Sequence, residues 1–196
     1  MDSVFAIKFQ DGVILASETT VNFSIFKLAK KYDKVQKLDS HSIMALAGDI
    51  ADRDHFSSYI KRNVEFFKFK SNGQRSSVRR SAQFVRGELA KAIRKNMKQV
   101  SPLVVGFDER KGPQVYWLDY LGTLCDVKYG VHGYSAYFAN SVLASGWKER
   151  MTQEEALQLA RDCIKAIKTR FMIDLEGYDI WVVDKDGARL ADHWTV

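Results

Sequence analysis

MDSVFAIKFQDGVILASETT, residues 1–20, is the stretch that decides the fold of this chain. Residues 3–9 and 13–18 are rich in apolar and β-branched side chains, and Gln10-Asp11-Gly12 separates them. Asp-Gly between two such runs is a strong hairpin signal, because the tight turn requires a positive φ that glycine adopts without steric cost. The stretch therefore predicts two antiparallel strands joined by a turn in which Gly12 has positive φ.

The remainder of the chain continues with alternating groups of strands and helices. Further strands are predicted over 34–38, 42–47, 102–107, 114–119, 124–129, 178–183 and 188–190. Helices are predicted over about 49–70, 77–97, 137–143 and 152–167. Two antiparallel sheets packed face to face, with a helical layer outside each, would bury all the apolar faces. The sequence therefore predicts an α+β fold, and its length of 196 residues predicts a single domain over 1–196.

The helices are predicted from their caps and their apolar periodicity. Asp49 can accept hydrogen bonds from the free N–H groups of a first helical turn. Thr152 and Glu155 have the spacing of a capping box. Apolar residues recur at helical spacing at Phe56, Ile60, Val64 and Phe67, and again at Val78, Ala82, Val85, Leu89, Ile93 and Met97.

The composition excludes several classes of protein. No run approaches the ~20 apolar residues that span a bilayer, and no signal peptide is recognisable, so we expect no membrane partner and a cytoplasmic and nuclear location. Cys125 and Cys163 lie far apart in sequence and are predicted to be buried thiols in a reducing compartment. The 4 histidines are scattered, so neither a metal site nor a cofactor is expected.

A basic stretch, residues 61–98, carries most of the excess positive charge of the chain, whose formal net charge is +6. Within it only Glu65 and Glu88 oppose the many lysines and arginines. Such a stretch could bind nucleic acid. Because the charges alternate with the apolar stripe and no nucleic-acid motif accompanies them, we interpret them as a solvated, partner-facing helix surface and expect no nucleic-acid partner.

Several motifs in order along the chain resemble those of the proteasome β-type subunits, which are N-terminal nucleophile hydrolases. They are Lys8–Ile14 (KFQDGVI), Met44–Asp49 (MALAGD), Asp119–Thr123 (DYLGT), Tyr129–Ser135 (YGVHGYS) and Val183–Gly187 (VDKDG). The resemblance covers essentially the whole chain and implies the four-layer αββα sandwich of that family. The third and fourth motifs resemble the fourth β position of the eukaryotic 20S ring.

The resemblance also implies which residues occupy the family's catalytic positions. Active members use the hydroxyl of an N-terminal Thr, with base chemistry from its own α-amine. Here Asp2 stands at the Thr position, Glu18 replaces a supporting Asp, Lys34 matches the catalytic Lys, and Tyr134 replaces a Ser. We therefore interpret these as vestigial positions without catalytic function and expect Lys34 to form an exposed ion pair with Glu18, worth only ~0–1 kcal/mol.

Residues 21–28 are unusually apolar for a connection between strands. Phe23, Ile25 and Phe26 either pack into the core of this chain or form part of an interface or pocket wall with a neighbouring chain. For an inactive subunit the resemblance implies a structural role. The chain would complete a seven-membered ring between two other β subunits and would dock on the α ring and on the opposite β ring. It would also form part of the wall of the chamber in which catalytic neighbours degrade proteins. The alternatives are an active N-terminal threonine protease or a basic nucleic-acid-binding module.

Overall fold

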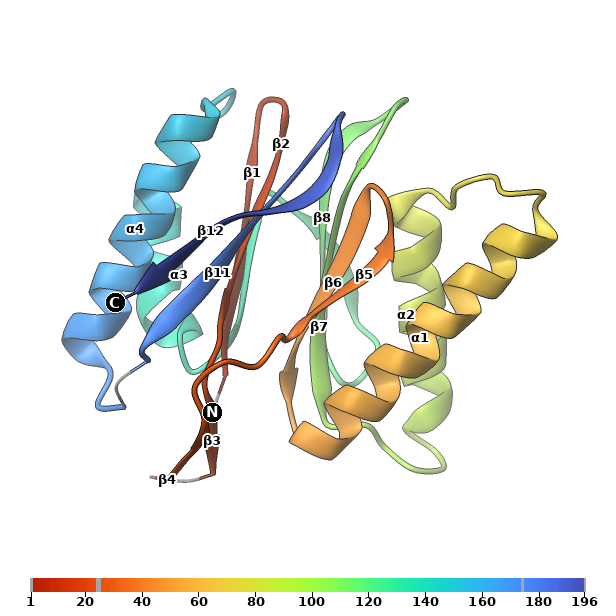
Figure 1. Ribbon diagram of the computed structural model, residues 1–196, viewed down its shortest axis with the longest axis horizontal. Helices are drawn as coiled ribbons and strands as arrows, with labels where there is room; N and C mark the ends of the chain where they lie inside the picture. The colour runs from red at the N-terminus through yellow and green to blue at the C-terminus, as the bar shows by residue number, and fades with distance from the viewer. Residues whose placement is uncertain (1, 24–25, 174, 196) are drawn as a thin grey trace.

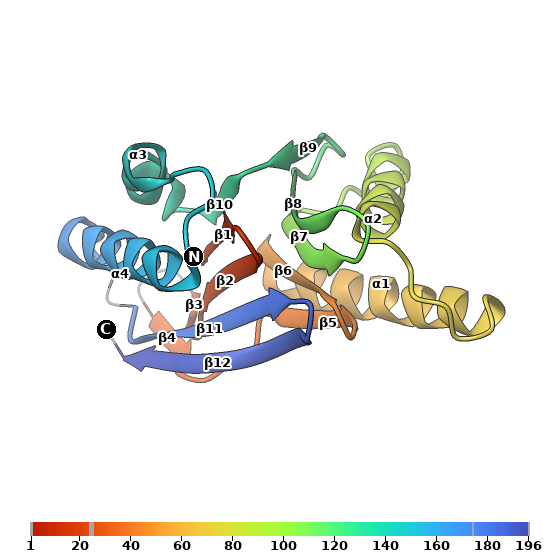
Figure 2. The ribbon, with the colours of Figure 1, turned by 90° about the horizontal axis from the view of Figure 1, so that it is seen from above.

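The computed structural model describes residues 2–23, 26–173 and 175–195, with the side chain of Phe23 excepted. Within these residues, two five-stranded antiparallel sheets lie face to face, and helices cover the outer face of each (Figures 1 and 2). The predicted α+β four-layer sandwich is confirmed.

The first sheet contains the N-terminal hairpin and the closing hairpin of the chain. In spatial order its strands are β10 (Tyr129–Gly133), β1 (Ser3–Phe9), β2 (Gly12–Glu18), β11 (Gly177–Asp184) and β12 (Gly187–Thr195). The helices α3 (Ala136–Gly146) and α4 (Gln153–Arg170) cover its outer face. Thr152 and Glu155 form the predicted capping box at the start of α4.

The second sheet is formed by the middle of the chain. In spatial order its strands are β5 (Val35–Asp39), β6 (Ser42–Gly48), β7 (Val100–Asp108), β8 (Gly112–Leu118) and β9 (Leu124–Val127). The helices α1 (Ile50–Lys70) and α2 (Val78–Ala92) cover its outer face (Figure 1). Asp49 caps α1 by accepting from the N–H groups of Ala51 and Asp52, as predicted.

The core follows the two-residue period of the strands, in which successive side chains point to opposite faces. On β1, Val4 and Ala6 pack between the two sheets, whereas Phe5 and Ile7 pack against α3 and α4. Burial of one such large side chain contributes about 1.5–3 kcal/mol. Because both faces of β1 and β2 are covered, the hairpin that opens the chain lies at the centre of the fold.

The hairpin is confirmed, but the predicted reason for Gly12 is wrong. Gly12 does not have positive φ, so the turn at Gln10 and Asp11 is made without it. A Cβ at Gly12 would lie 2.6 Å from the Phe9 ring and 2.6 Å from the carbonyl oxygen of Val183. Glycine is therefore required by the close approach of β11 rather than by backbone conformation.

The single strand predicted over 124–129, with a lead into a helix after it, is also wrong. The chain forms β9 at the edge of one sheet and then crosses to form β10 at the edge of the other. Strand β10 pairs with β1 from Ser3↔Gly133 to Ile7↔Tyr129. The crossing satisfies backbone groups of β1 that would otherwise be buried without partners.

Three smaller predictions also fail. Residues 21–29 are not a simple connection, since β3 (Val21–Phe23) and β4 (Phe26–Ala29) form a separate two-stranded sheet. The second helix ends at Ala92, and Ile93 and Met97 beyond it are 38% and 41% exposed. Cys125 is exposed because β9 is an edge strand, whereas Cys163 is buried in α4 as predicted.

The basic stretch 61–98 is less unbalanced in space than in sequence. Lys68 pairs with Asp39 at 2.7 Å, Lys98 pairs with Asp52 at 3.0 Å, and Arg75 pairs with Glu109. These acids lie outside the stretch, on β5, on α1 before it and on the β7–β8 turn. Part of the positive charge of this stretch is therefore paired within the chain.

Candidate functional site

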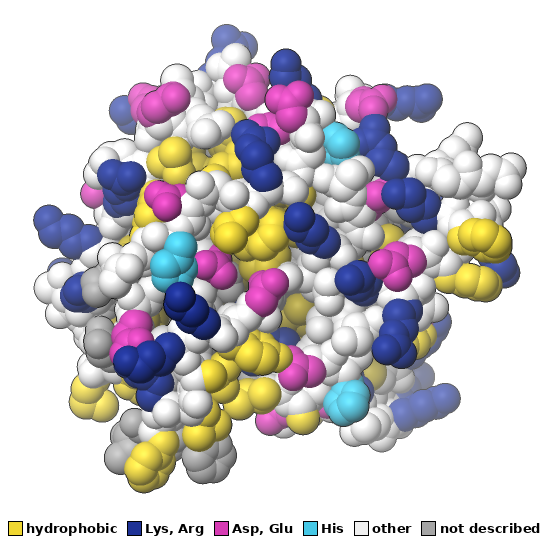
Figure 3. Space-filling view, in the orientation of Figure 1, with side chains coloured by type: hydrophobic (Ala, Val, Ile, Leu, Met, Phe, Trp, Pro, Cys, Tyr) yellow, Lys and Arg dark blue, Asp and Glu magenta, His cyan; other side chains and the backbone are white. Residues whose placement is uncertain are grey.

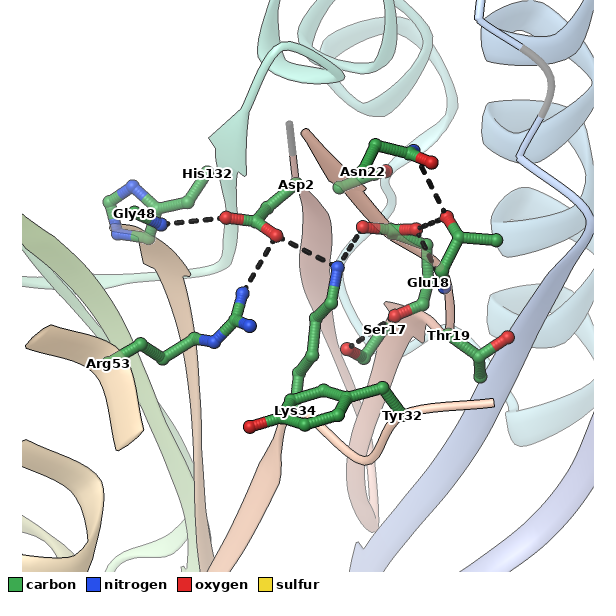
Figure 4. A network of polar contacts seen from close by, with 12 residues as sticks. Asp2, Ser17, Glu18, Thr19, Asn22, Tyr32, Lys34, Gly48, Arg53 and His132 are labelled. Carbon is green, nitrogen blue, oxygen red and sulfur yellow. Dashed lines mark hydrogen bonds and ion pairs between the residues drawn. The ribbon is translucent and has the colours of Figure 1, made fainter. Parts of the chain in front are cut away.

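One end of the sandwich brings together the residues that flank four strands (Figure 4). Asp2 precedes β1, Glu18 ends β2, Lys34 precedes β5 and Gly48 ends β6. The antiparallel register of β1 and β2 places the start of one beside the end of the other. Arg53, in the first turns of α1, completes the cluster. Three residues that the sequence predicted to share a site, Asp2, Glu18 and Lys34, thus meet in the structure.

The carboxylate of Asp2 is saturated with hydrogen-bond donors. Its Oδ1 accepts from Lys34 Nζ at 2.8 Å and from an Arg53 guanidinium nitrogen at 2.9 Å. Its Oδ2 accepts from the backbone N–H of Gly48 at 2.8 Å. The side chain of Asp2 is only 8% exposed. The carboxylate is therefore a fixed acceptor held by two cations and one backbone amide.

Lys34 lies between two carboxylates and is fully buried. It donates to Asp2 on one side and to Glu18 Oε1 on the other. Glu18 Oε2 in turn accepts from the Thr20 hydroxyl and from the Thr20 N–H, the latter at 3.1 Å. The predicted ion pair between Lys34 and Glu18 is present, but the expectation that it is exposed is wrong, because both partners are buried at the junction of the two sheets.

The two carboxylates have pKa values displaced in opposite directions. Burial alone would raise the pKa of Asp2, but attraction to Lys34 and Arg53 and the Gly48 hydrogen bond outweigh it, and the net effect lowers the pKa. Burial is the dominant effect on Glu18 and raises its pKa despite the contact with Lys34. Asp2 is thus the carboxylate that the cluster holds most firmly in its charged form.

Arg53 is the residue of the cluster that sequence reasoning missed. It is 2% exposed, and among the described residues its Nε and one terminal nitrogen have no hydrogen-bond partner. Its guanidinium lies 5.3 Å from the centroid of the Tyr32 ring. The available signal was spacing, since Arg53 precedes Phe56 and Ile60 on the apolar stripe of α1 and is therefore turned toward the sheet.

Tyr134, predicted to occupy a vestigial catalytic position, is not part of the ion-pair cluster. Its side chain is 49% exposed and stacks on Phe171 at 6.0 Å between ring centroids. Its backbone N–H donates to the Asp2 carbonyl at 3.2 Å. The preceding residue, Gly133, has φ 82°, and a Cβ there would lie 1.9 Å from the same carbonyl oxygen. The β10–α3 junction therefore holds the backbone of Asp2 rather than its side chain.

The hydroxyl groups of Ser3 and Thr19, which lie near the cluster, are engaged in contacts outside it. Ser3 shares a hydrogen bond of 2.8 Å with the Tyr178 hydroxyl, and Thr19 donates to the Gly177 carbonyl at 3.3 Å. Among the described residues, the ammonium of Lys34 donates to the two carboxylates and to no hydroxyl. The arrangement can bind and orient charge, and the hydroxyl that it brings against a carboxylate is that of Thr20, which donates to Glu18.

His132 lies close to the cluster and is a neutral structural side chain. Burial lowers its pKa to about 4. Its Nε2 contacts the Pro102 carbonyl at 3.1 Å, and its ring stacks on Trp117 at 4.8 Å. It therefore links β10 to the second sheet and is not oriented toward Asp2 as a general base.

The apolar segment 21–28 is placed only in part by the structure. Ile25 lies outside the described residues, as does the side chain of Phe23. Phe26 and Leu28 on β4 are 66% and 64% exposed, so this strand does not pack into the core of the chain. The hairpin is fastened by Lys27 and Lys30, which contact Glu176 at 2.6 and 3.4 Å.

Two other features of the described ranges bear on the kind of site that is present. No three His, Cys, Asp or Glu side chains in these ranges are grouped so that they could hold a metal ion. No helix in the same part of the chain combines the length and apolar character needed to cross a membrane.

Comparison with known proteins identifies the family. The model of the proteasome subunit family matches residues 2–183. The chain is 38% identical over 194 residues to proteasome subunit beta type-4 of Saccharomyces cerevisiae, covering 98% of each protein. It is 39% identical over 189 residues to proteasome subunit beta type-2-B of Arabidopsis thaliana, covering 96% of this chain and 94% of the plant protein. A probable proteasome subunit beta type-4 of Schizosaccharomyces pombe is 35% identical to the chain over 191 residues, and the alignment covers 96% of this chain and 98% of that protein.

These relatives agree on the type of subunit although their names carry different numbers. All are named β-type subunits, and each alignment extends along nearly the whole of both proteins. The face-to-face sheets and the helical layers therefore belong to a chain whose residues 2–183 match that family. The chain belongs to the proteasome subunit family, as one of its β-type subunits.

Proposed function

We propose that this chain is a non-catalytic, structural β subunit of the 20S proteasome core particle and occupies the fourth β position of the ring. Residues 1–196 act as one domain that completes the seven-membered β ring and part of the chamber wall. Catalytic neighbours in the same particle carry out ubiquitin- and ATP-dependent protein degradation, in the cytoplasm and the nucleus. The motifs at 119–123 and 129–135, and the beta type-4 names of two yeast relatives, support this position.

The observation that carries the proposal is the state of Asp2. A threonine hydroxyl at this position would need to be free to attack a carbonyl carbon, with a base beside it. The carboxylate found there is instead held by Lys34, Arg53 and the Gly48 amide. A carboxylate in three charge-assisted or backbone hydrogen bonds is a poor nucleophile for peptide bonds. The residues that would activate a nucleophile thus stabilise a charge pair.

The structural role requires two different interfaces on one chain. A ring of unlike subunits uses heterologous contacts, so each face is complementary to a different neighbour. Each stable contact is expected to bury more than ~1,000 Å² in total. We propose that the β3–β4 hairpin, with Phe26 and Leu28 exposed, forms one such contact or the wall of a neighbour's substrate pocket. The helices α1 and α2, with their basic residues, are the proposed docking face for another subunit.

Native mass spectrometry of particles isolated through a tag on this chain tests the structural proposal. The expected result is that the chain is found in a multisubunit particle with other α and β subunits, and that very little travels alone at its own mass of 22.4 kDa. Recovery of the chain mainly as a free 22.4 kDa species from cells with intact particles would contradict the proposal.

A further inference from the structure

A groove lies between α4 and the end of β12, away from the cluster around Asp2. Its volume is about 450 Å³, and α4 lines it with Arg161, Ile164, Lys165 and Lys168. The opposite wall is the end of β12, with His193 and Trp194. On the face shown in Figure 3, basic and acidic side chains and a histidine are mixed on the left, where Figure 1 places α4 and β12. The groove is therefore a surface shared by one helix and one edge strand.

The charged side chains that line this groove carry charge of one sign, which is positive. Among the described residues no Asp or Glu lines it, and Lys165 and Lys168 form no ion pair. Nearby acids are used in other contacts: Asp179 binds His193 at 2.7 Å, and Asp192 accepts from the Trp194 indole N–H at 2.7 Å. The exposed cations of α4 are thus available to carboxylates from outside the chain.

The groove also has an apolar floor and a free strand edge. Ile164 is 6% exposed and packs in the core, and Trp194 packs against the same cluster of side chains. The guanidinium of Arg161 lies 4.8 Å from the centroid of the Trp194 ring, which holds both side chains in place. Strand β12 is the outermost strand of its sheet in the described part of the chain, so its outer backbone groups are free to pair.

We infer that the α4–β12 groove binds a short acidic segment of another subunit of the same particle. Carboxylates of that segment meet Lys165 and Lys168, and an apolar side chain lies on Trp194 and Ile164. Charge complementarity identifies the occupant, because three cations and no acid line the groove among the residues that the structure describes. The apolar floor and the free strand edge suit an extended peptide better than a nucleic acid, which would require a longer basic track. The inference rests on the proposed role as a ring subunit.

Zero-length crosslinking of the assembled particle tests this inference. A water-soluble carbodiimide joins a lysine amine to a carboxylate only when the two are in contact. After treatment of particles isolated through this chain, peptide mass spectrometry should find Lys165 or Lys168 joined to an Asp or Glu of another subunit. The doubly reversed variant Lys165→Glu/Lys168→Glu should reduce incorporation of the chain into particles by about tenfold, as expected for loss of a charged contact.

The control changes the same number of charges outside the groove. Lys148→Glu/Arg170→Glu alters two exposed basic residues that do not line it and should leave incorporation within about twofold of the unmodified chain. Crosslinks of Lys165 and Lys168 only to acids of this chain, to a protein outside the particle, or to none would overturn the inference. Equal loss of incorporation in both variants would also overturn it. Recovery of the unmodified chain in particles is measured separately. A chain that is not recovered in particles contradicts the ring role, whereas a chain in particles without the crosslink contradicts only the binding of a segment in the groove.

Discussion

At the residue scale, Asp2 and Glu18 show how one lysine can be shared unequally. Lys34 contacts both carboxylates, but only Asp2 also receives Arg53 and the Gly48 amide. The pKa of Asp2 is consequently lowered and that of Glu18 is raised by burial. A buried ion cluster of this kind is costly to break, because removing one partner leaves an uncompensated charge.

Replacing Asp2 should therefore destabilise the chain in a pH-dependent manner. Asp2→Asn should lower the free energy of unfolding at pH 7 by about 3–5 kcal/mol, since Lys34 and Arg53 lose a buried counter-charge. A carboxyl whose folded-state pKa is lowered contributes stability above its unfolded pKa and loses it as pH falls through the folded value. The difference between the two proteins should thus shrink below about pH 4. Urea unfolding of the unmodified chain and of Asp2→Asn at pH 7 and pH 3 measures this difference in the free energy of unfolding.

Glu18→Gln is the matched comparison, and its pH dependence should have the opposite sign. Because the folded-state pKa of Glu18 is raised, its contribution is fully present below the unfolded pKa and is lost as pH rises through the folded value. Relative to Glu18→Gln, the unmodified chain should therefore become less stable as pH rises above about 4.5. The same slope for both variants would show that the two carboxylates are not displaced in opposite directions.

That Asp2, Glu18 and Lys34 belong to one site could be predicted from sequence, whereas their contacts could not. Resemblance to a family places Asp2, Glu18 and Lys34 by alignment of short motifs. It does not reveal that Lys34 is buried, because burial depends on how the two sheets meet. Arg53 was missed because arginine on an amphipathic helix is usually exposed, and only its position on the apolar stripe indicates otherwise.

At the element scale, the β10–α3 junction makes Gly133 irreplaceable. Gly133→Ala combines a strained φ of 82° with a Cβ placed 1.9 Å from the Asp2 carbonyl oxygen. Gly73 is a natural control, since it has φ 80° and no heavy atom within 4 Å of the added Cβ. Gly73→Ala should lower the free energy of unfolding by about 1–3 kcal/mol through backbone strain. Gly133→Ala should lower it further, because β1 or β10 must move to make room for the Cβ. Urea unfolding of both variants at pH 7 measures these two changes. Equal losses in the free energy of unfolding would mean that the contact of Gly133 with Asp2 imposes no constraint.

The β3–β4 hairpin should influence a neighbour rather than this chain. Phe26→Ser removes an exposed apolar side chain, so we expect normal assembly and at least about a threefold change in kcat/KM of an adjacent catalytic subunit for a fluorogenic peptide. Tyr137→Ser, at an 83% exposed position on α3 outside both proposed contact faces, is the control and should leave those kinetics unchanged. Unaltered kinetics in fully assembled Phe26→Ser particles would contradict a pocket-wall role.

Most strands and helices were predictable because central strands such as β1, β2 and β6 are runs of apolar residues and each helix has one apolar face. Strand β10 was not, because Gly130 and Gly133 interrupt it and read as turn residues. Its place is fixed by the free edge of β1, a tertiary requirement with no local signal. The short hairpin at 21–29 was missed for a similar reason, since it is held by Lys27 and Lys30 through contacts to Glu176, which is distant in sequence.

In the whole molecule, the central strands form the buried core, whereas the β3–β4 hairpin and the helices lie on different sides of the surface. The cluster around Asp2 closes one end of the sandwich, the β3–β4 hairpin extends below it in Figure 1, and α1 and α2 lie on the side opposite α4. This distribution suits a subunit that contacts several unlike neighbours at once. The end of the sandwich at which β1 begins holds the ion pairs of Lys34 with Asp2 and Glu18.

Covalent labelling of the assembled particle with an inhibitor directed at N-terminal threonine, followed by intact-mass analysis of every subunit, tests whether this chain carries a catalytic nucleophile. We expect the catalytic subunits to gain the mass of the inhibitor and this chain to remain unlabelled. Labelling of this chain in the same sample would contradict the account, because it would require a free nucleophile where the structure holds the Asp2 carboxylate between Lys34 and Arg53.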